Sequence, residues 1–222
     1  MPQQTLSKQD VIDVVQFLKD SRQELRRAAC QGALVASADE DGCKTLQEAG
    51  GIPLLCRLTG DHQLIAKDAV TALVNAAATS PAIIEEMVQK DVTDRVMENV
   101  GSSVSDSNVE AEASDSMTAT CLKLLANVTT VDAGVEQMLQ MGKAGGALEG
   151  LHVRKLIRWF TQHPCAGAST EDVWEHVASI LVNISRHEAG QKLLMRPQLQ
   201  LLQQLLPELH SANVVRRIGV SG

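Results

Sequence analysis

The chain has 222 residues, of which 44% are apolar and only 2% aromatic, and it contains no Tyr. So few aromatic side chains argue against a β-sandwich or β-barrel, whereas the remaining apolar residues, mainly Leu, Val, Ala, Ile and Met, suit closely packed helices. The net charge of −7 opposes a phosphate backbone, so nucleic acid is not expected as a partner of the chain as a whole.

The N-terminal sequence carries no basic stretch followed by an apolar run, which excludes a secretory signal of the usual type. No segment approaches the roughly 18 consecutive apolar residues of a membrane span. These two features predict a cytoplasmic protein without a membrane partner, with the nucleus as the alternative compartment.

The five cysteines are odd in number and form no close Cys-x-x-Cys pair, so a disulfide scaffold is not expected. Cys30, Cys56 and Cys121 lie inside apolar helical patterns. Free Cys behaves there as a small apolar residue, and the sequence therefore predicts buried thiols.

The first predicted helix covers residues 11–18, where apolar side chains follow a polar start and form one buried side. A degenerate helical unit follows over residues 25–55. Within it, Gly50 and Gly51 supply a break with permissive backbone angles, and Pro53 suits the first turn of the next helix, where no N–H is needed. We expect a short loop between stacked helices at this point.

Three later segments match one another position by position: Ala69–Asn75 (AVTALVN), Cys121–Asn127 (CLKLLAN) and Val177–Asn183 (VASILVN). Counting back from each Asn, the second residue is always Leu. The first, second, fifth and sixth residues before the Asn share one helical face, so each segment predicts a helix with a similar apolar stripe. The shared leucines, Leu73, Leu125 and Leu181, are expected in the core.

A second helix follows each Asn, with an apolar residue twelve positions on: Met87, Leu139 and Met195, in helices that begin after Pro81, Gly134 and Gly190. The repeat is longer than the roughly 40 to 47 residues of armadillo and HEAT units. Two inserts explain the excess, namely a flexible Ser-rich and acidic loop over residues 101–116 and a second insert around residues 161–169. The pattern predicts a single all-α domain over residues 1–222, an armadillo/HEAT-like right-handed α-solenoid.

The segment Leu151–Phe160 predicts an amphipathic helix with one basic side. Its apolar side is formed by residues at helical spacing: Val153, Leu156, Ile157 and Phe160. Arg154, Lys155 and Arg158 fall on the opposite side. This basic side either solvates an outer helix or binds an acidic protein partner.

Two strings carry a narrower resemblance. Val177–Met195 (VASILVNISRHEAGQKLLM) and Val215–Gly222 (VRRIGVSG) resemble strings of the armadillo-like family known as the HGH-one homologs. In that family a further helical half, opening with an Asn-Cys-Cys-Phe-like run, follows the second string. Because that run is absent here, the resemblance implies an N-terminal half with a truncated C-terminal end.

The same resemblance implies a function. It implies a protein-binding scaffold that acts as a chaperone or co-chaperone, assisting the folding of translation elongation factor 2 together with the cytosolic chaperonin. Two alternatives stay open: a generic armadillo adaptor between proteins, and an RNA-associated scaffold.

Three asparagines recur at one position of the repeat: Asn75, Asn127 and Asn183. In armadillo folds such residues line a groove, where an amide can bind the backbone of an extended client without reading its side chains. The alternative is that each Asn bonds a neighbouring backbone group and satisfies a helix end. The positions four residues earlier hold no Trp, which disfavours a receptor for nuclear-localisation signals.

Two further expectations concern the last part of the chain. Arg216 and Arg217 are candidates to bind acidic loops or a carboxylate-bearing client, unless this end frays. Apolar exposure is predicted along the segment before them, because no following unit covers it: Leu202, Leu205, Leu206 and Leu209.

No motif predicts catalysis, a metal or a cofactor. The histidines around Cys165 lack the compact spacing of a zinc cluster. Gly142–Gly146 has a misplaced Lys and no following Ser or Thr, unlike a phosphate-binding loop. No nucleophile is placed beside a base, so the sequence predicts a binding protein that is not an enzyme.

Overall fold

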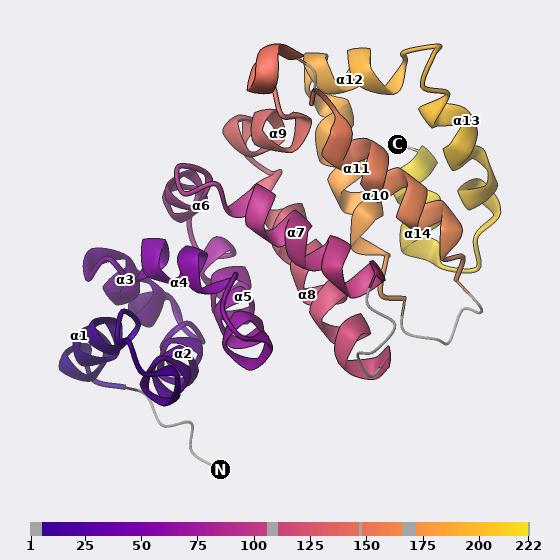
Figure 1. The fold of residues 1–222 in the computed structure, drawn as a ribbon. Coiled ribbons are helices and arrows are strands. Elements are labelled where there is room, and N and C mark those ends of the chain that lie inside the picture. The colour runs from indigo at the N-terminus through magenta and orange to yellow at the C-terminus, as the bar shows by residue number, and fades with distance from the viewer. Residues whose placement is uncertain (1–5, 106–110, 147, 166–171, 222) are drawn as a thin grey trace. The chain divides into compact units, whose positions relative to one another are not determined.

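The computed structural model describes residues 6–105, 111–146, 148–165 and 172–221. These residues form helices joined by turns, with no strand among them (Figure 1). They divide into two compact units, Met1–Ser102 and Ser103–Gly222, which we call unit 1 and unit 2. The all-α fold expected from the composition and the helical periodicity is confirmed.

Unit 1 begins with α1 (Lys8–Phe17), whose first turn is closed by a reciprocal capping box between Ser7 and Asp10. The helices that follow are α2 (Gln23–Ala36), α3 (Glu40–Glu48), α4 (Gly51–Leu58), α5 (Gln63–Ala77), α6 (Pro81–Val88) and α7 (Val92–Ser105). α2 packs on α1 and α5, and α4 packs on α5. The break before α4 is at Gly50, which has a φ of 74°, and Pro53 lies in the first turn of α4 as predicted.

Unit 2 continues the same pattern of long and short helices. Its elements are α8 (Ala111–Val128), α9 (Asp132–Leu139), the 3₁₀ helix η1 (Lys143–Gly146), α10 (Leu151–Gln162), α11 (His176–Arg186), α12 (Glu188–Leu194), α13 (Leu201–Leu205), the 3₁₀ helix η2 (Leu206–His210) and α14 (Val214–Ser221). α11 packs against both α8 and α14, and α14 also packs against η2 (Figure 1).

The matched segments of the sequence lie on α5, α8 and α11, which together with α2 and α14 we call the repeat helices. Leu73, Leu125 and Leu181 are all buried. Because each stripe occupies the same face of its helix, each repeat helix can pack its neighbour within the unit in the same way. The predicted apolar stripe is confirmed.

The predicted loop over residues 101–116 is wrong at both of its ends. α7 extends to Ser105, and α8 already begins at Ala111. Residues 106–110, the remainder of the prediction, lie outside the described residues. The apolar side chains of Val96 and Val100 are buried, so packing sustains α7 into a stretch whose composition alone suggested a loop.

The turns that lead into α9 and α12 leave no room for a side chain. The sequence was interpreted as placing Gly134 and Gly190 before a helix, but both lie inside the first turns of α9 and α12. A Cβ atom would lie 1.9 Å from the Val128 carbonyl oxygen at Gly134, and 2.1 Å from the Ile184 carbonyl oxygen at Gly190. Glycine is therefore required because the short helix crosses the end of the repeat helix at contact distance.

The ends of unit 2 correct two expectations about apolar residues. Met195 is 70% exposed at the end of α12, whereas Met87 and Leu139 are buried in their helices. Leu202, Leu206 and Leu209 are exposed, as predicted. Leu205 is only 5% exposed, so its prediction was wrong: α13 packs on α10, and this contact places Leu205 on the inner side.

We expect Gly190→Ala to lower the free energy of unfolding of the chain by about 3 kcal/mol, because the new methyl group overlaps a backbone carbonyl that cannot rotate away. Denaturant unfolding followed by circular dichroism measures this. Gly60→Ala is the control, since its Cβ would meet only the Arg57 carbonyl oxygen at 3.8 Å. A loss of less than 1 kcal/mol for Gly190→Ala would contradict the close approach.

Candidate functional site

Asn75 and Asn183 each bond to the end of the preceding repeat helix in their own unit. In unit 1, Asn75 Nδ2 donates to Ser37 Oγ at 3.1 Å. In unit 2, Asn183 Nδ2 donates both to the Ala126 carbonyl oxygen and to Thr129 Oγ1, each at 3.1 Å. We call these contacts ladder bonds, because they join successive repeat helices within a unit and occupy acceptors at the end of a helix.

The ladder bonds orient the amide groups. A backbone carbonyl can only accept a hydrogen bond, so the amide nitrogen of Asn183 must face Ala126 and its carbonyl oxygen must point elsewhere. Within the described part of the chain, the Oδ1 atoms of Asn75 and Asn183 accept no hydrogen bond. Asn127 is half-buried at the corresponding position of α8.

The two interpretations of these residues therefore do not exclude each other. Half of each amide satisfies the neighbouring helix end, as the structural alternative proposed. The other half, an acceptor on a half-buried side chain, stays available in Asn75 and Asn183.

A groove of about 390 Å³ lies between α11 and α14 of unit 2. It is lined by polar and aliphatic residues: Ser179, Val182, Asn183, Val214, Val215, Ile218 and Gly219. Val215 is 42% exposed and Ile218 is 66% exposed. A Cβ at Gly219 would lie 2.4 Å from the Ala178 Cβ, so the two helices touch at this point. Their contact leaves an open apolar groove with the Asn183 amide at one side.

The basic helix α10 has the predicted amphipathic arrangement. All four residues of its predicted apolar side are buried: Val153, Leu156, Ile157 and Phe160. Lys155 and Arg158 are exposed, and Arg154 is half-buried. The Nε atom of Arg154 is buried and makes no hydrogen bond within the described residues. The helix thus offers two exposed positive charges, on a different element from the asparagines.

The prediction that Arg216 binds a client is wrong, because its side chain is fully buried, at 0% exposure. Its guanidinium donates to Asp172 Oδ1 at 2.8 Å and to Glu208 Oε2 at 3.1 Å. It also donates to two backbone carbonyls, those of Phe160 at 3.1 Å and His163 at 2.7 Å, and stacks 4.3 Å from the centre of the Phe160 ring. Each charge and donor has a partner, as a buried ion needs.

The neighbouring Arg217 has a local role as well. It is half-buried, and its Nη1 donates to the carbonyl oxygens of Ser211 at 2.6 Å and Ala212 at 3.2 Å. These contacts tie the start of α14 to the turn that precedes it. The two arginines, adjacent in sequence, therefore hold α14 in place instead of forming a common surface.

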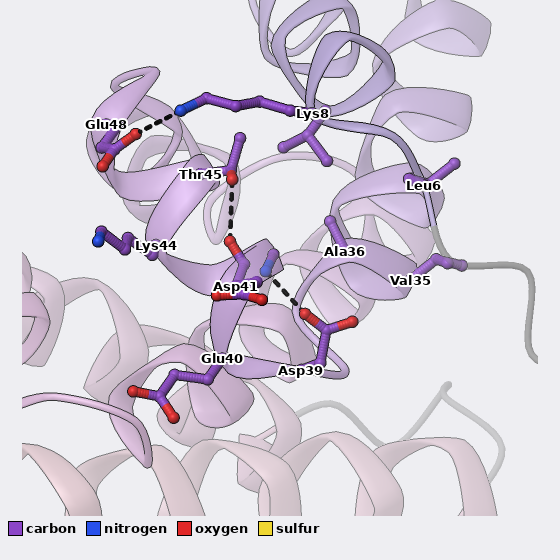
Figure 2. Close-up of a pocket in the computed structure, with 12 residues that line it drawn as sticks. Leu6, Lys8, Val35, Ala36, Asp39, Glu40, Asp41, Lys44, Thr45 and Glu48 are labelled. Atoms are coloured by element: carbon purple, nitrogen blue, oxygen red, sulfur yellow. Dashed lines mark hydrogen bonds and ion pairs between the residues drawn. The ribbon is translucent and has the colours of Figure 1, made fainter.

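Unit 1 has a pocket of about 640 Å³ between α1, the end of α2 and the start of α3 (Figure 2). Lys8 Nζ bonds Glu48 Oε2 at 3.0 Å across it, and this contact lowers the pKa of Glu48. Asp39 caps α3 by accepting from the Gly42 N–H at 2.7 Å, and Glu40 and Asp41 lie in the first turn. Carboxylates at this end stabilise the helix dipole, which accounts for the acidic pocket without a ligand.

Most of the cysteine side chains lie in the core. Cys30, Cys43, Cys56 and Cys121 are buried, which confirms the three predicted buried thiols. Burial raises the pKa of Cys30, Cys56 and Cys121 to about 12, so these thiols stay protonated and unreactive at neutral pH. Among the described residues no group of His, Cys, Asp or Glu could hold a metal ion, and no described helix is long and apolar enough to cross a bilayer.

Sequence reasoning did not single out the aliphatic side of the groove. Val215 and Ile218 lie in the string used for the family resemblance, but only the packing of α14 on α11 turns them into a surface. It also did not single out Asn99, whose Nδ2 donates to the Thr59 carbonyl oxygen at 2.8 Å in unit 1. The sequence gives one sign of this role, because Asn99 directly precedes the apolar Val100, which is buried in α7.

Comparisons with known proteins agree with this description. The chain is 23% identical over 214 residues to the protein described as "Protein HGH1 homolog" from Dictyostelium discoideum. The match covers 95% of this chain and 56% of that relative, so the chain spans little more than half of the relative's length. The family resemblance predicted from the two strings is confirmed.

Solved structures of armadillo repeat proteins share the fold. One, described as computationally designed armadillo repeat proteins for modular peptide recognition, matches 95% of this chain and 79% of its own with a TM-score of 0.73 at 19% identity. Another, a designed armadillo repeat protein in complex with the peptide (KR)4, matches 96% of this chain and 82% of its own with a TM-score of 0.70 at 18% identity. At these identities the match establishes the armadillo-like α-solenoid fold.

Residues 109–222 match the family described as "Domain of unknown function (DUF383)". This match covers half of the chain, and it includes the Asn183 ladder bond, the groove and the buried Arg216. The chain therefore belongs to this family.

We expect Arg216→Met to lower the free energy of unfolding by about 3 to 5 kcal/mol, because Asp172 and Glu208 would remain buried without a positive partner. Denaturant unfolding measures the change, with Arg217→Met as the matched control at less than about 1 kcal/mol. Combining Arg216→Met with Asp172→Asn and Glu208→Gln should recover part of the loss. Equal stability of the parent and Arg216→Met would show that the cluster contributes little.

We expect Cys165, which is half-exposed, to react with a maleimide before the other four cysteines in the native protein at pH 7.5. The reason is that the raised pKa values and burial keep the other thiols protonated and out of reach. Mass spectrometry of peptides after timed labelling measures the order, and labelling in denaturant is the control. Equally fast labelling of Cys121 would mean that α8 is not packed as described.

Proposed function

We propose that this member of the DUF383 family is a protein-binding scaffold that holds extended segments of client proteins on its repeat helices. More specifically, we propose a cytoplasmic chaperone or co-chaperone that assists the folding of translation elongation factor 2 together with the cytosolic chaperonin. The scaffold follows from the site, whereas the client follows from the family resemblance.

The observation that carries the proposal is the orientation of Asn183. Its nitrogen is occupied by the ladder bond, while its carbonyl oxygen has no partner in the described structure and its side chain lines an open groove. A fixed acceptor of this kind can receive the backbone N–H of any residue except Pro. It therefore suits clients that are unfolded and present no defined surface.

The aliphatic side of the groove supports the same role. Val215 and Ile218 would bury an apolar side chain of the bound segment, which contributes about 25 cal/mol for each Å² removed from water. Backbone capture beside an apolar surface favours extended chains over folded partners. The designed armadillo repeat protein in complex with the peptide (KR)4 supports the proposal, because it is a protein of this fold with a bound peptide.

We expect the chain to bind purified, denatured elongation factor 2 upon dilution and to slow its aggregation, with Asn183→Ala weakening the affinity between about twofold and tenfold. Light scattering measures aggregation, and fluorescence anisotropy of labelled elongation factor 2 measures the affinity. A generic adaptor would instead bind folded partners and leave aggregation unchanged.

Thr129→Val is the control for an effect on binding that arises only because the ladder bond is weakened. It removes one acceptor of the ladder bond from the buried side and leaves the Asn183 side chain itself unchanged. The stability of both variants is measured in parallel. If Thr129→Val weakens the binding as much as Asn183→Ala, the Asn acts only through the fold and the proposed contact is wrong.

A further inference from the structure

Apart from Glu112 and Asp115 in the first part of α8, the charged side chains on the repeat helices of unit 2 are positive. α8 from residue 116 to its end, α11 and α14 contain no Asp or Glu. Their charged side chains are Lys123, Arg186 and the two arginines of α14. His176 adds no lasting charge, because burial lowers its pKa. Because Arg216 is buried and paired with Asp172 and Glu208, the exposed positive charges of these helices are those of Lys123 and Arg186.

Lys123 and Arg186 are the accessible charges of this set. Lys123 is exposed on α8, four residues before Asn127, and Arg186 is exposed on α11, three residues after Asn183. Residues three or four apart share a helix face, so each cation lies on the side of its helix that carries the Asn. We call Lys123, Arg186, Asn183 and the groove residues Val215 and Ile218 the groove surface.

Neither cation has an ion-pair partner within the described residues, whereas other exposed cations do. Lys192 pairs with Glu188, and Arg196 pairs with Glu149 at 2.8 Å. Burial lowers the pKa of His176, and Lys123 lies near enough to add to this effect while Glu175 and Asp172 oppose it, so Lys123 lies close to the start of α11. Unpaired charges of one sign beside an apolar groove favour a partner of the opposite sign.

We infer that the groove surface binds an extended acidic segment, in which an aliphatic side chain contacts Val215 and Ile218 while flanking carboxylates face Lys123 and Arg186. This inference rests on the proposed function and narrows it from any unfolded segment to one class of sequence. In this arrangement the Asn183 carbonyl oxygen accepts a hydrogen bond from the backbone of the bound segment. Lys123 and Arg186 favour acidic residues on either side of the bound aliphatic residue. Lys123 and Arg186 would repel a basic segment.

The composition of the groove disfavours RNA as the occupant. Single-stranded nucleic acid is bound by aromatic stacking together with a continuous basic channel. The lining residues of the groove include no aromatic side chain and no Lys or Arg, and the groove surface as defined above has two exposed cations, Lys123 and Arg186. An acidic peptide needs no more than these two charges and the apolar contact.

Three fluorescein-labelled peptides of equal length test the inference: one with Leu flanked by aspartates, one with the aspartates replaced by lysines, and one with the Leu replaced by Ser. Fluorescence anisotropy with the full chain measures their affinities at low and at physiological salt. We expect the first peptide to bind at least about tenfold more tightly than the second, with the difference reduced by salt. The third should bind more weakly than the first.

Charge reversal at the groove supplies the second readout. The double variant Lys123→Glu, Arg186→Glu should lose about tenfold in affinity for the aspartate peptide and gain affinity for the lysine peptide. Lys155→Glu on α10 is the matched control, because it reverses an exposed charge on another helix. Ile218→Ser should lower the affinity for both peptides that contain Leu, without changing the ratio of the affinities for the aspartate and the lysine peptide.

Each of the other possible results contradicts a specific part of the inference or of the proposed function. Equal binding of the aspartate and lysine peptides overturns the charge selection and leaves the proposed function standing. An effect of Lys155→Glu as large as that of the double variant moves the acidic partner to α10. Displacement of the aspartate peptide by single-stranded RNA overturns the choice of a peptide. If neither a peptide nor denatured elongation factor 2 binds, the proposed function itself fails.

Discussion

The packing of one repeat helix on the next is the interaction on which this structure depends. A helix with an apolar stripe as wide as that around Leu125 or Leu181 cannot bury it alone, so each repeat helix is stable only beside a neighbour. The ladder bond of Asn183 adds a hydrogen-bond requirement to the same contact. The amide nitrogen can reach its two acceptors only when Asn183 on α11 lies beside the C-terminal end of α8. Packing and hydrogen bonding thus specify the same register.

The groove exists because α14 is held against α11 by two contacts of different kinds. Gly219 allows the helices to touch at Ala178, and the buried Arg216 binds groups from α10, from η2 and from Asp172 in the segment before α11. The charge of Arg216 is therefore neutralised inside the fold, and removing this arginine would leave two buried carboxylates without a positive partner. The exposed Val215 and Ile218 are presented on the same short helix, so the buried arginine positions the apolar side of the groove.

The distribution of charge in unit 2 gives the groove its proposed selectivity. Acidic residues are frequent in the chain but absent from α8 after Asp115, from α11 and from α14. Lys123 and Arg186 consequently lack the carboxylates that neutralise cations elsewhere, and their field acts on whatever enters. A neutral acceptor for the backbone, an apolar surface and two free cations together describe a site that accepts many sequences but ranks them by charge.

The sequence by itself determined the repeat. The recurring Leu and Asn at helical spacing predicted α5, α8 and α11, the buried leucines and the buried thiols, because periodicity records which face of a helix leaves water. It also placed Leu202 and Leu206 on the surface. It failed where neighbours in space overrule local composition: residues 101–105 are helical because Val96 and Val100 are packed, and Leu205 is covered by α10.

Only the tertiary structure decided the site. Arg216 and Arg217 are indistinguishable in sequence, yet one is sealed between Asp172 and Glu208 and the other holds a turn, since burial depends on residues far away along the chain. The same holds for the groove, whose two sides come from helices separated by the whole of α12 and α13. A linear pattern encodes which side of a helix is apolar, but the partner that covers it, and the surface left uncovered, follow from three-dimensional packing.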